Sequence, residues 1–319
     1  MNTPGSLRLR LVRISYEAER VCSFEFEDVY GGLLPPATPG AHVDISLPSG
    51  LSRSYSLVGT GAALRRYVVA VHHAPNSRGG SALMHETLRV GTILDVGRPR
   101  NNFPLVEDAP HSVLIAGGIG VTPLLSMVDR LIALGRSFEL HYSARTEDSA
   151  AYRRRLLDLD RDDQVHFHFD GGSPADFLDI GAICSAAPAD AHLYCCGPTS
   201  MLESFTLATA DRPESQVHLE HFSPAESAAT DGGYVVALGR SGREFQIAPG
   251  TSILDTLLDD GLDLSYSCSE GTCGSCEVRV LEGIPDHRDS VLTPEERRAN
   301  DRMMICCSGS KSGRIVLDL

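Results

Sequence analysis

Three cysteines, Cys268, Cys273 and Cys276, lie within nine residues, and Cys306 follows thirty residues after the third. Glycines at positions 271 and 274 allow the backbone to curl closely, so that the three sulfurs can point at one centre. A zinc ribbon would use two paired Cys-x2-Cys knuckles. The spacing Cys-x4-Cys-x2-Cys with a distant fourth cysteine is instead that of ligands around a [2Fe-2S] cluster. We therefore predict an iron-sulfur site at these four cysteines, with zinc and disulfide bonds as the alternatives.

The C-terminal stretch that carries these cysteines resembles a plant-type ferredoxin domain. Its pattern predicts a hairpin at 234–238 and 244–247, helices at 252–260 and from Thr293, and strands at 277–281, 303–306 and 315–319. This order resembles the β-grasp fold of ferredoxins. Cys307 could replace its neighbour as the fourth ligand. The family pattern Cys-x-Ser, matched here by Cys306 and Ser308, favours Cys306.

Length, composition and charge restrict the class of protein. The chain has 319 residues, 42% of them hydrophobic, which predicts two or three domains. No apolar run approaches the roughly 20 residues that span a bilayer, and the N-terminus lacks a signal-peptide stretch, so we expect a cytoplasmic protein without a membrane partner. The net charge of −14 also disfavours nucleic acid. Nine cysteines in that compartment read as metal ligands and reduced thiols.

The first hundred residues alternate apolar and polar side chains in short runs separated by glycine or proline. This pattern predicts an antiparallel β-barrel. The expected strands are 7–15, 21–27, 42–47, 53–58, 67–72 and 92–96, with a short helical segment at 82–88.

Two segments of the predicted barrel suit a phosphate. Arg53-Ser54-Tyr55-Ser56 offers a guanidinium fork, and Arg78-Gly79-Gly80-Ser81 opens the helical segment with backbone N–H groups. Each alone could be an ordinary strand or turn. Together they predict a ligand that carries a phosphate.

The two segments resemble the flavin-binding barrel of the ferredoxin-NADP reductase superfamily. The resemblance implies that Arg53 contacts the flavin phosphate, that Tyr55 packs on the isoalloxazine and that the Ser56 hydroxyl lies near flavin N5. The glycine segment resembles the FMN-phosphate loop of the phthalate dioxygenase reductase family. That likeness implies FMN as the flavin, with Arg78, Gly80 and Ser81 as phosphate ligands. We place Ser54 and His72 in the same cofactor site.

From residue 111 the pattern changes to buried strands that alternate with helices, which predicts a doubly wound α/β domain. Gly117 to Gly120 follow the strand 112–116, and Thr122 and Pro123 would start a helix as N-cap and first residue. A glycine turn between strand and helix lets a pyrophosphate approach the backbone. Further strands are expected at 138–143, 165–169, 192–196 and 216–220, and helices at 124–134, 150–159 and 201–209.

Cys196-Gly197-Pro198 ends one of these strands at the edge where open α/β sheets bind ligands. A buried cysteine there could simply be a small hydrophobic side chain. The trio resembles the reductase motif whose cysteine lies beside the nicotinamide C4, which nominates Cys196 together with Gly197 and Pro198. The same resemblance places Gly118, Thr122 and Pro123 along the dinucleotide, Arg145 near its adenosine half and Phe222 over the flavin. Ser56, Cys196 and Phe222 are the predicted catalytic residues.

The histidines give no metal pattern in the sequence. His72 and His73 are adjacent and point to opposite sides of a strand, whereas His166 and His168 share a side. We expect the latter two to lack a nearby carboxylate or cysteine companion. We therefore expect none of these histidines to bind a metal.

The resemblance to the phthalate dioxygenase reductase family covers essentially the whole chain. It implies an FMN-binding Greek-key β-barrel at 1–106, an NAD-binding α/β domain at 107–224 and a [2Fe-2S] β-grasp domain at 225–319. The implied activity is electron transfer from NADH through FMN and [2Fe-2S] to a Rieske-type oxygenase partner, by a chain that we expect to be a monomer. The alternatives are a reductase of the phenylacetyl-CoA-oxygenase type that uses FAD and NADPH, and a redox sensor or passive electron carrier.

Charge distribution adds two expectations. Residues 225–319 carry 16 Asp or Glu against 9 Lys or Arg, so a basic partner surface would be steered towards this stretch unless the acidic side chains merely aid solubility. Glu147 and Asp148 after Arg145 would repel a 2′-phosphate, which favours NADH over NADPH.

Overall fold

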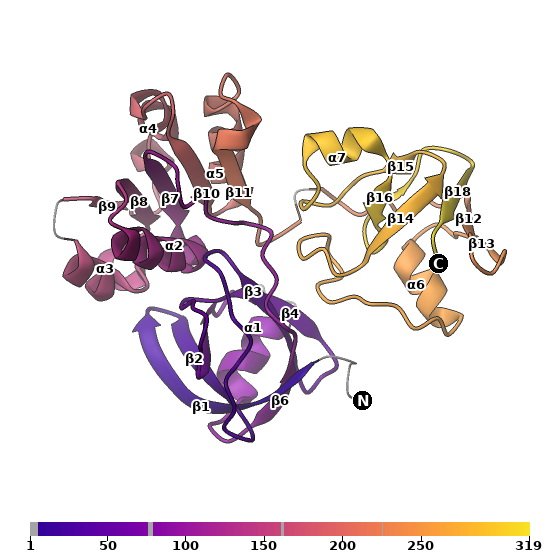
Figure 1. Cartoon of the computed structure of the whole chain (residues 1–319), viewed down its shortest axis with the longest axis horizontal. Helices are drawn as coiled ribbons and strands as arrows, with labels where there is room; N and C mark the ends of the chain where they lie inside the picture. The colour runs from indigo at the N-terminus through magenta and orange to yellow at the C-terminus, as the bar shows by residue number, and fades with distance from the viewer. Residues whose placement is uncertain (1–5, 76–78, 161–162, 225) are drawn as a thin grey trace. The chain divides into compact units, whose positions relative to one another are not determined.

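The computed structural model describes residues 6–75, 79–160, 163–224 and 226–319, and it divides the chain into two compact units (Figure 1). The first unit ends at Phe222 and the second runs from Ser223 to Leu319. Among the described residues, no helix has both the length and the apolar character needed to cross a membrane. The three domain boundaries expected from the sequence stay a prediction.

The first half of the first unit is a closed antiparallel barrel. Its strands are β1 (Leu7–Ala18), β2 (Val21–Asp28), β3 (His42–Ser46), β4 (Ser52–Ser56), β5 (Arg66–His72) and β6 (Ile93–Val96). They pair in the order β4-β3-β6-β1-β2-β5, and a bridge between Leu57 and Val69 joins the two outer strands. Alternate side chains such as Leu9, Leu11, Phe24 and Phe26 fill the interior, as their period of two requires. The predicted helical segment is a turn α1 (Gly80–Ala82) followed by a π-helical turn (Leu83–Thr87).

The second half of this unit is a parallel sheet covered by helices on both faces. The strands are β7 (Ser112–Gly117), β8 (Phe138–Ala144), β9 (Val165–Phe169), β10 (His192–Cys196) and β11 (Val217–Glu220). The helices are α2 (Val121–Leu134), α3 (Arg153–Leu159), α4 (Ile180–Ala186) and α5 (Thr199–Ala208). The strand order β11-β10-β7-β8-β9 reverses direction between β7 and β10, which confirms the doubly wound topology.

Two details of this domain differ from the sequence prediction. The helix α2 begins at Val121 with Gly120 as its N-cap, so the assignment of Thr122 as N-cap was wrong. A 3-10 turn over Gly118–Gly120 leads directly into α2, so the helix begins one residue before Thr122. The helix α4 was not expected, and it starts where the Asp179 side chain accepts a hydrogen bond from the Ala182 N–H.

The barrel and the parallel sheet share one hydrophobic core. Val58, Ala70 and Phe103 pack in the same cluster as Leu124 and Met127 of α2. Hydrogen bonds also cross between the halves, including one from the Glu19 N–H to the Asp148 carbonyl at 2.7 Å. The Gly40 N–H donates to Ser126 Oγ at 3.0 Å, and the Val106 N–H donates to Tyr194 Oη at 2.9 Å. The nucleotide edge is thus held in a fixed position against the barrel.

The second unit is a mixed sheet with the order β13-β12-β18-β14-β16, over which α6 packs. Its elements are β12 (Val235–Leu238), β13 (Glu244–Gln246), α6 (Ile253–Asp259), β14 (Glu277–Glu282), β15 (Pro285–Asp286), α7 (Pro294–Ala299), β16 (Arg302–Met304), β17 (Gly309–Ser310) and β18 (Arg314–Leu317). Strands β12 and β18 are parallel, whereas β12–β13, β14–β16 and β14–β18 are antiparallel. The expected hairpin, helices and strands are all present within two residues of their predicted limits.

The contact between barrel and α2 leads to the first prediction. Gly40 has φ +87°, and an added Cβ would lie 1.9 Å from the Phe103 carbonyl oxygen. Gly50 has nearly the same backbone angle, φ +83°, with no atom within 4 Å of its Cβ position. We expect Gly50→Ala to lower the free energy of unfolding by about 1 kcal/mol through backbone strain alone. Gly40→Ala should cost about 3 kcal/mol because it adds overpacking.

The measurement is denaturant unfolding of both variants followed by circular dichroism. Equal losses of unfolding free energy in the two variants would show that the close approach of Gly40 to Phe103 does not add to the stability of the protein.

Candidate redox sites

The four predicted cluster cysteines come together in the second unit. Cys268, Cys273 and Cys276 lie on the loop between α6 and β14, and Cys306 follows β16. All four are at most 5% exposed. Two backbone donors point at one sulfur, since the N–H groups of Glu270 and Thr272 lie 3.3 and 3.4 Å from Cys268 Sγ. Ser275 Oγ lies within hydrogen-bonding distance of Cys273 Sγ, at 3.0 Å.

The sulfurs lie within hydrogen-bonding distance of one another. Hydrogen bonds from Cys273 and then Cys306 lower the pKa of the Cys268 thiol, and the bond with Cys268 raises the pKa of Cys306. Cys306 likewise lowers the pKa of Cys276. Four buried thiols that face each other, with backbone N–H groups directed at them, suit the thiolate ligands of an iron-sulfur core. The residues therefore fit the [2Fe-2S] cluster that the spacing predicted.

Cys307 lies against the cluster loop at a different point. A Cβ on Gly271 would be 2.5 Å from Cys307 Sγ and 3.0 Å from Asp289 Cα, and Gly271 has φ +72°. The neighbouring segment is held there because Ser290 N–H donates to the Gly271 carbonyl at 2.8 Å. The thiol of Cys307 is 3.8 Å from both Met304 O and Ser308 Oγ. Cys307 therefore packs against the backbone of the cluster loop at Gly271, which is consistent with Cys306 as the ligand.

The predicted phosphate site contains an arginine that packs on a glycine. Arg53 lies on β4, and a Cβ on Gly80 would be 2.8 Å from Arg53 Cγ and 3.0 Å from its Nε. The backbone can therefore approach the guanidinium only because residue 80 has no side chain. Ser81 follows and is half-buried. Arg78 lies outside the described residues. Arg53 and Gly80 fit the phosphate of a flavin.

The neighbouring residues of β4 divide between the two faces of the strand. Tyr55 shares the face of Arg53, and burial raises the pKa of its hydroxyl to about 12, so the ring is neutral. Ser54 points to the other face and donates to Asp44 at 2.6 Å, which gives it a structural partner. Ser56 is buried at the end of the strand. His72, at the end of β5, has its pKa lowered mainly by burial and next by Arg20.

The predicted dinucleotide site lies where the ends of β7 and β10 meet. A Cβ on Gly120 would be 2.2 Å from the Cys196 carbonyl oxygen, and one on Gly117 would be 2.6 Å from Pro198 Cδ. Gly197 lies close to the backbone of Gly117. Gly118 has φ +53° and open space around it. The glycines thus bring the two turns into contact and leave backbone accessible to a pyrophosphate.

Other predicted dinucleotide residues lie at the same edge with different surroundings. Thr122 is buried and its hydroxyl donates to the Ile119 carbonyl at 3.0 Å, and Pro123 is buried beside it. Both form the first turn of α2. Arg145 is exposed directly after β8. Glu147, expected to repel a 2′-phosphate, forms an ion pair with Arg153 at 3.0 Å. That pairing weakens the repulsion and leaves Asp148 as its main source.

The catalytic candidate Cys196 lies beside a carboxyl group that the sequence prediction missed. Burial, and then the nearby Glu220, raise the pKa of the Cys196 thiol, which is therefore neutral. Glu220 is paired with Cys196 across β10 and β11. Burial raises the pKa of Glu220 to about 8, and its Oε2 has no hydrogen-bond partner among the described residues. The one signal for Glu220 in the sequence was its position two residues before Phe222. The Phe222 side chain is 42% exposed.

Comparison with known proteins gives matches along the whole chain. A family model described as "2Fe-2S iron-sulfur cluster binding domain" matches residues 236–310, and one described as "Oxidoreductase NAD-binding domain" matches residues 114–206. These matches confirm the predicted iron-sulfur and nucleotide-binding domains.

Three curated relatives align with nearly complete coverage. Tetrachlorobenzoquinone reductase of Sphingobium chlorophenolicum is 47% identical over 100% of this chain and 99% of its own. Vanillate O-demethylase oxidoreductase of Pseudomonas sp. (strain HR199 / DSM 7063) is 42% identical over 95% and 96%. Phthalate dioxygenase reductase of Burkholderia cepacia is 37% identical over 100% of both chains.

Two solved structures resemble the fold. Phthalate dioxygenase reductase, described as a modular structure for electron transfer from pyridine nucleotides to [2Fe-2S], has a TM-score of 0.74 at 37% identity and covers 99% of this chain and 98% of its own. An intact type IV self-sufficient cytochrome P450 monooxygenase has a TM-score of 0.88 at 35% identity and covers 98% of this chain and 41% of its own. The predicted order of barrel, nucleotide-binding domain and ferredoxin domain is confirmed.

The neighbouring thiols 306 and 307 give the second prediction. We expect Cys306→Ala to abolish the visible absorption of the cluster, because one of four ligands is lost. Cys307→Ala should retain that absorption, because only a side chain packed against the cluster loop changes. Iron content and the visible spectrum of the purified variants measure both effects. Loss of the cluster in Cys307→Ala with retention in Cys306→Ala would reverse the ligand assignment.

The contact between Arg53 and Gly80 gives the third prediction. In Gly80→Ala the new methyl group would displace the Arg53 side chain, so the dissociation constant for FMN should rise about tenfold, or about 1.4 kcal/mol. Gly32→Ala is the control, since its Cβ would lie at an ordinary 3.5 Å from the Asp28 carboxylate in the same barrel. Fluorescence titration of the flavin-depleted proteins with FMN gives the constants. An unchanged constant in Gly80→Ala would remove Arg53 from the phosphate site.

Proposed function

The chain belongs to the phthalate dioxygenase reductase family, and on that basis we propose that it is the reductase component of a two-component Rieske-type oxygenase system. In this role it takes electrons from NADH and delivers them singly to the oxygenase. The observation that carries the proposal is that one chain holds four buried, mutually facing cysteine sulfurs as well as a glycine-lined nucleotide edge.

The cofactor set follows from the need to divide an electron pair. Bound FMN would convert one hydride into two single-electron transfers, and a [2Fe-2S] cluster accepts one electron at a time. Arg53, Arg78, Gly80 and Ser81 are the proposed phosphate ligands. Cys268, Cys273, Cys276 and Cys306 are the proposed cluster ligands. The proposed domains are 1–106 for FMN, 107–224 for NADH and 225–319 for the cluster.

The side chains proposed to surround the reacting rings bind and orient those rings while remaining uncharged themselves. Tyr55 offers a neutral aromatic face, and the neutral, buried Cys196 offers a small wall beside the nicotinamide. Glu220 holds its proton at neutral pH because its pKa is about 8, so it presents no negative charge either to the neutral nicotinamide of NADH or to the positively charged ring that remains after hydride transfer. Ser56 and Phe222 complete the proposed site. Ser54 in the middle of β4 and His72 at the end of β5 are proposed to support it.

NADH is the proposed donor, with a higher kcat/KM than NADPH. Asp148 beside Arg145 disfavours a 2′-phosphate, although Arg145 itself could accept one. A chain of the phenylacetyl-CoA-oxygenase type would instead release FAD and prefer NADPH. A redox sensor would bind both cofactors without steady turnover. Chromatography of the released flavin and the two kcat/KM values separate these alternatives.

The cluster-bearing unit is the proposed docking surface for the oxygenase. Its net charge is −7, from 16 acidic and 9 basic residues between 225 and 319. Glu277 is 43% exposed and 3.7 Å from Arg302, whereas Glu270 on the cluster loop is half-buried. A basic oxygenase surface would associate faster with this unit at low salt, because exposed charges are screened beyond about 10 Å near 0.1 M salt. A monomer in the cytoplasm, where NADH is supplied and thiols stay reduced, completes the proposal.

The fourth prediction tests electron delivery. With NADH, the wild-type protein should reduce both ferricyanide and cytochrome c, the first directly from the flavin and the second by way of the cluster. Cys306→Ala should lose at least about 90% of cytochrome c reduction, a tenfold effect, and retain ferricyanide reduction. Cys307→Ala is the matched control and should retain both. If Cys306→Ala reduces cytochrome c at the wild-type rate, electrons do not leave through the cluster and the proposal fails.

A further inference from the structure

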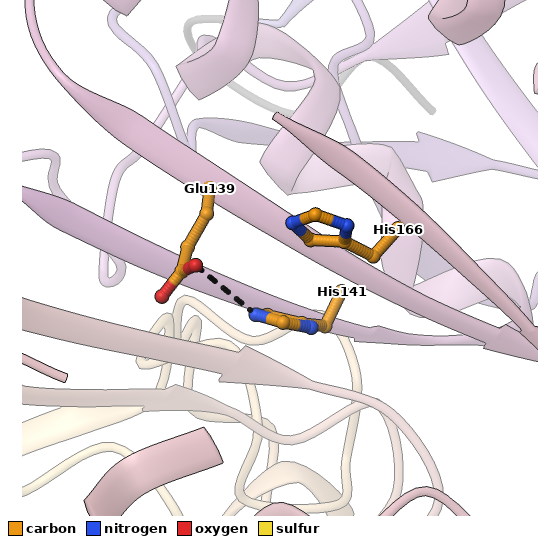
Figure 2. Close-up of side chains that lie close together, drawn as sticks. All are labelled: Glu139, His141 and His166. Carbon is orange, nitrogen blue, oxygen red and sulfur yellow. Dashed lines mark ion pairs between the residues drawn. The ribbon is translucent and has the colours of Figure 1, made fainter. Parts of the chain in front are cut away.

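A group of potential metal ligands lies at the amino ends of two strands of the parallel sheet. Glu139, His141 and His166 each place one potential ligand atom within 4.8 Å of the others (Figure 2). The expectation that His166 lacks a carboxylate companion was wrong. Its companions come from another strand, so they are not close in the sequence.

The sheet itself brings these side chains together. Strands β8 and β9 are parallel neighbours, and His141 is in register with His166. Glu139 is two residues before His141 and therefore projects from the same face. The two imidazole rings lie 4.9 Å apart between centroids, and Glu139 Oε2 lies 3.5 Å from His141 Nε2. Figure 2 shows the carboxylate and both rings close together, with the Glu139 carboxylate directed at the His141 ring.

The polar atoms of this group are poorly satisfied by the protein. His141 Nε2 is buried and has no hydrogen bond among the described residues, because the Glu139 oxygen 3.5 Å away is too distant for a strong one. The neighbouring imidazoles, His141 first, hold the pKa of Glu139 below its usual range, so the carboxylate is charged. A fourth candidate is nearby. His111 Nε2 lies 3.9 Å from Glu139 Oε1, and its Nδ1 is fixed by Ser137 Oγ at 2.8 Å.

We propose that Glu139, His141 and His166 bind one divalent transition-metal ion, for which zinc is the best match. Two imidazole nitrogens and one carboxylate oxygen are ligands that zinc accepts at roughly 2.0–2.2 Å. Small side-chain rotations that move each ligand atom by less than about 1 Å would bring the three atoms to such a distance from a common centre. His111 or water completes a tetrahedral shell. The side chains of His141 and Glu139 are 16% and 29% exposed, so an ion can enter from solvent.

The ion holds the edge of the sheet and takes no part in electron transfer. Glu139 and His166 are each the second residue of their strands, whereas Arg145 and Cys196 mark the opposite, carboxyl ends. Six residues of strand from Glu139 to Arg145 correspond to about 20 Å. Among the strands that the structure describes, β9 is the last in the sheet and has β8 as its single neighbour. A metal bridge between these two strands therefore reduces local opening of β9.

Other histidines of the chain supply the controls. His168 projects from the same face of β9 as His166, but its Nε2 is 2.6 Å from the Asp176 carbonyl oxygen. His192 and His218 form a stacked pair with ring nitrogens 3.0 Å apart, on strands β10 and β11. His168→Gln and His218→Gln should leave the proposed site intact.

The fifth prediction is tested on the holoprotein, so that the four cluster cysteines are already engaged. Zinc chloride is titrated by calorimetry, and the bound ion is examined by X-ray absorption at the zinc edge. The wild type, His168→Gln and His218→Gln should bind one zinc ion with only nitrogen and oxygen in the first shell. His141→Gln, His166→Gln and Glu139→Gln should each weaken binding by at least about tenfold.

Hydrogen exchange provides a second measurement that does not depend on activity. Zinc should slow the exchange of β9 amides in the wild type and in His168→Gln, and it should have no such effect in His166→Gln. Retained flavin and cluster absorption identify variants that have folded, and Glu139→Gln keeps the size of the side chain.

Three results would overturn the proposal. The first is equal zinc binding by all variants, which would place the ion elsewhere. The second is sulfur in the first shell, at about 2.3 Å, which would assign it to cysteine. The third is no measurable binding by the wild type, which would leave only a hydrogen-bonded group of histidine and glutamate. Failure here does not affect the electron-transfer proposal, whose test uses NADH and cytochrome c.

Discussion

The shared core between the barrel and α2 is the constraint on which the redox chemistry of the first unit depends. Hydride transfer needs the two reacting rings in contact, so the two halves that bind them must be fixed relative to each other. Phe103, Leu124 and Met127 supply the apolar part of that contact. The hydrogen bonds from Gly40 and Val106 set its register. Because both halves contribute to one core, the side chains of β4 that we propose for the flavin and those of β10 that we propose for the nicotinamide have constant relative positions.

The two redox sites solve opposite electrostatic problems. Around Cys196 the protein removes charge, since burial keeps Cys196 and Glu220 in their neutral forms. Around Cys268 it supplies donors, since two backbone N–H groups point at one sulfur. A ring that exchanges a hydride changes its own charge. Neutral side chains around it therefore do not strongly favour either its oxidised or its reduced form. A cluster held by four thiolates is anionic, so hydrogen-bond donors stabilise it.

The sequence predicted those parts of the fold that depend on local pattern. The six barrel strands follow from alternation, and the cysteine loop follows from the spacing of its ligands with glycine. The helix α4 was not predicted because Ile180–Ala186 is short, contains Gly181 and has few strong helix formers, so its stability comes from Asp179 and from packing on the sheet. Glu220 could not be identified either, because its pKa depends on burial against β10. The group at Glu139 requires the pairing of His141 with His166, a register that no single strand encodes.

The position of the Glu139 group shows how one sheet can bind a ligand at one edge and be stabilised by a metal ion at the other. In a parallel sheet the loops that follow the strands gather at one edge, and ligands bind there because those loops vary freely. The amino ends of the same strands meet no substrate, so side chains there can be selected for holding neighbours together. The outermost strand needs this most, because β9 pairs with one strand only, β8, among the described residues. Polar side chains on β8 and β9 can stay half-exposed at this edge, since α4 and α5 pack mainly over the central strands. A metal ion bound there would strengthen the weakest pairing of the sheet, while the ends of β7 and β10 that approach the dinucleotide keep their geometry.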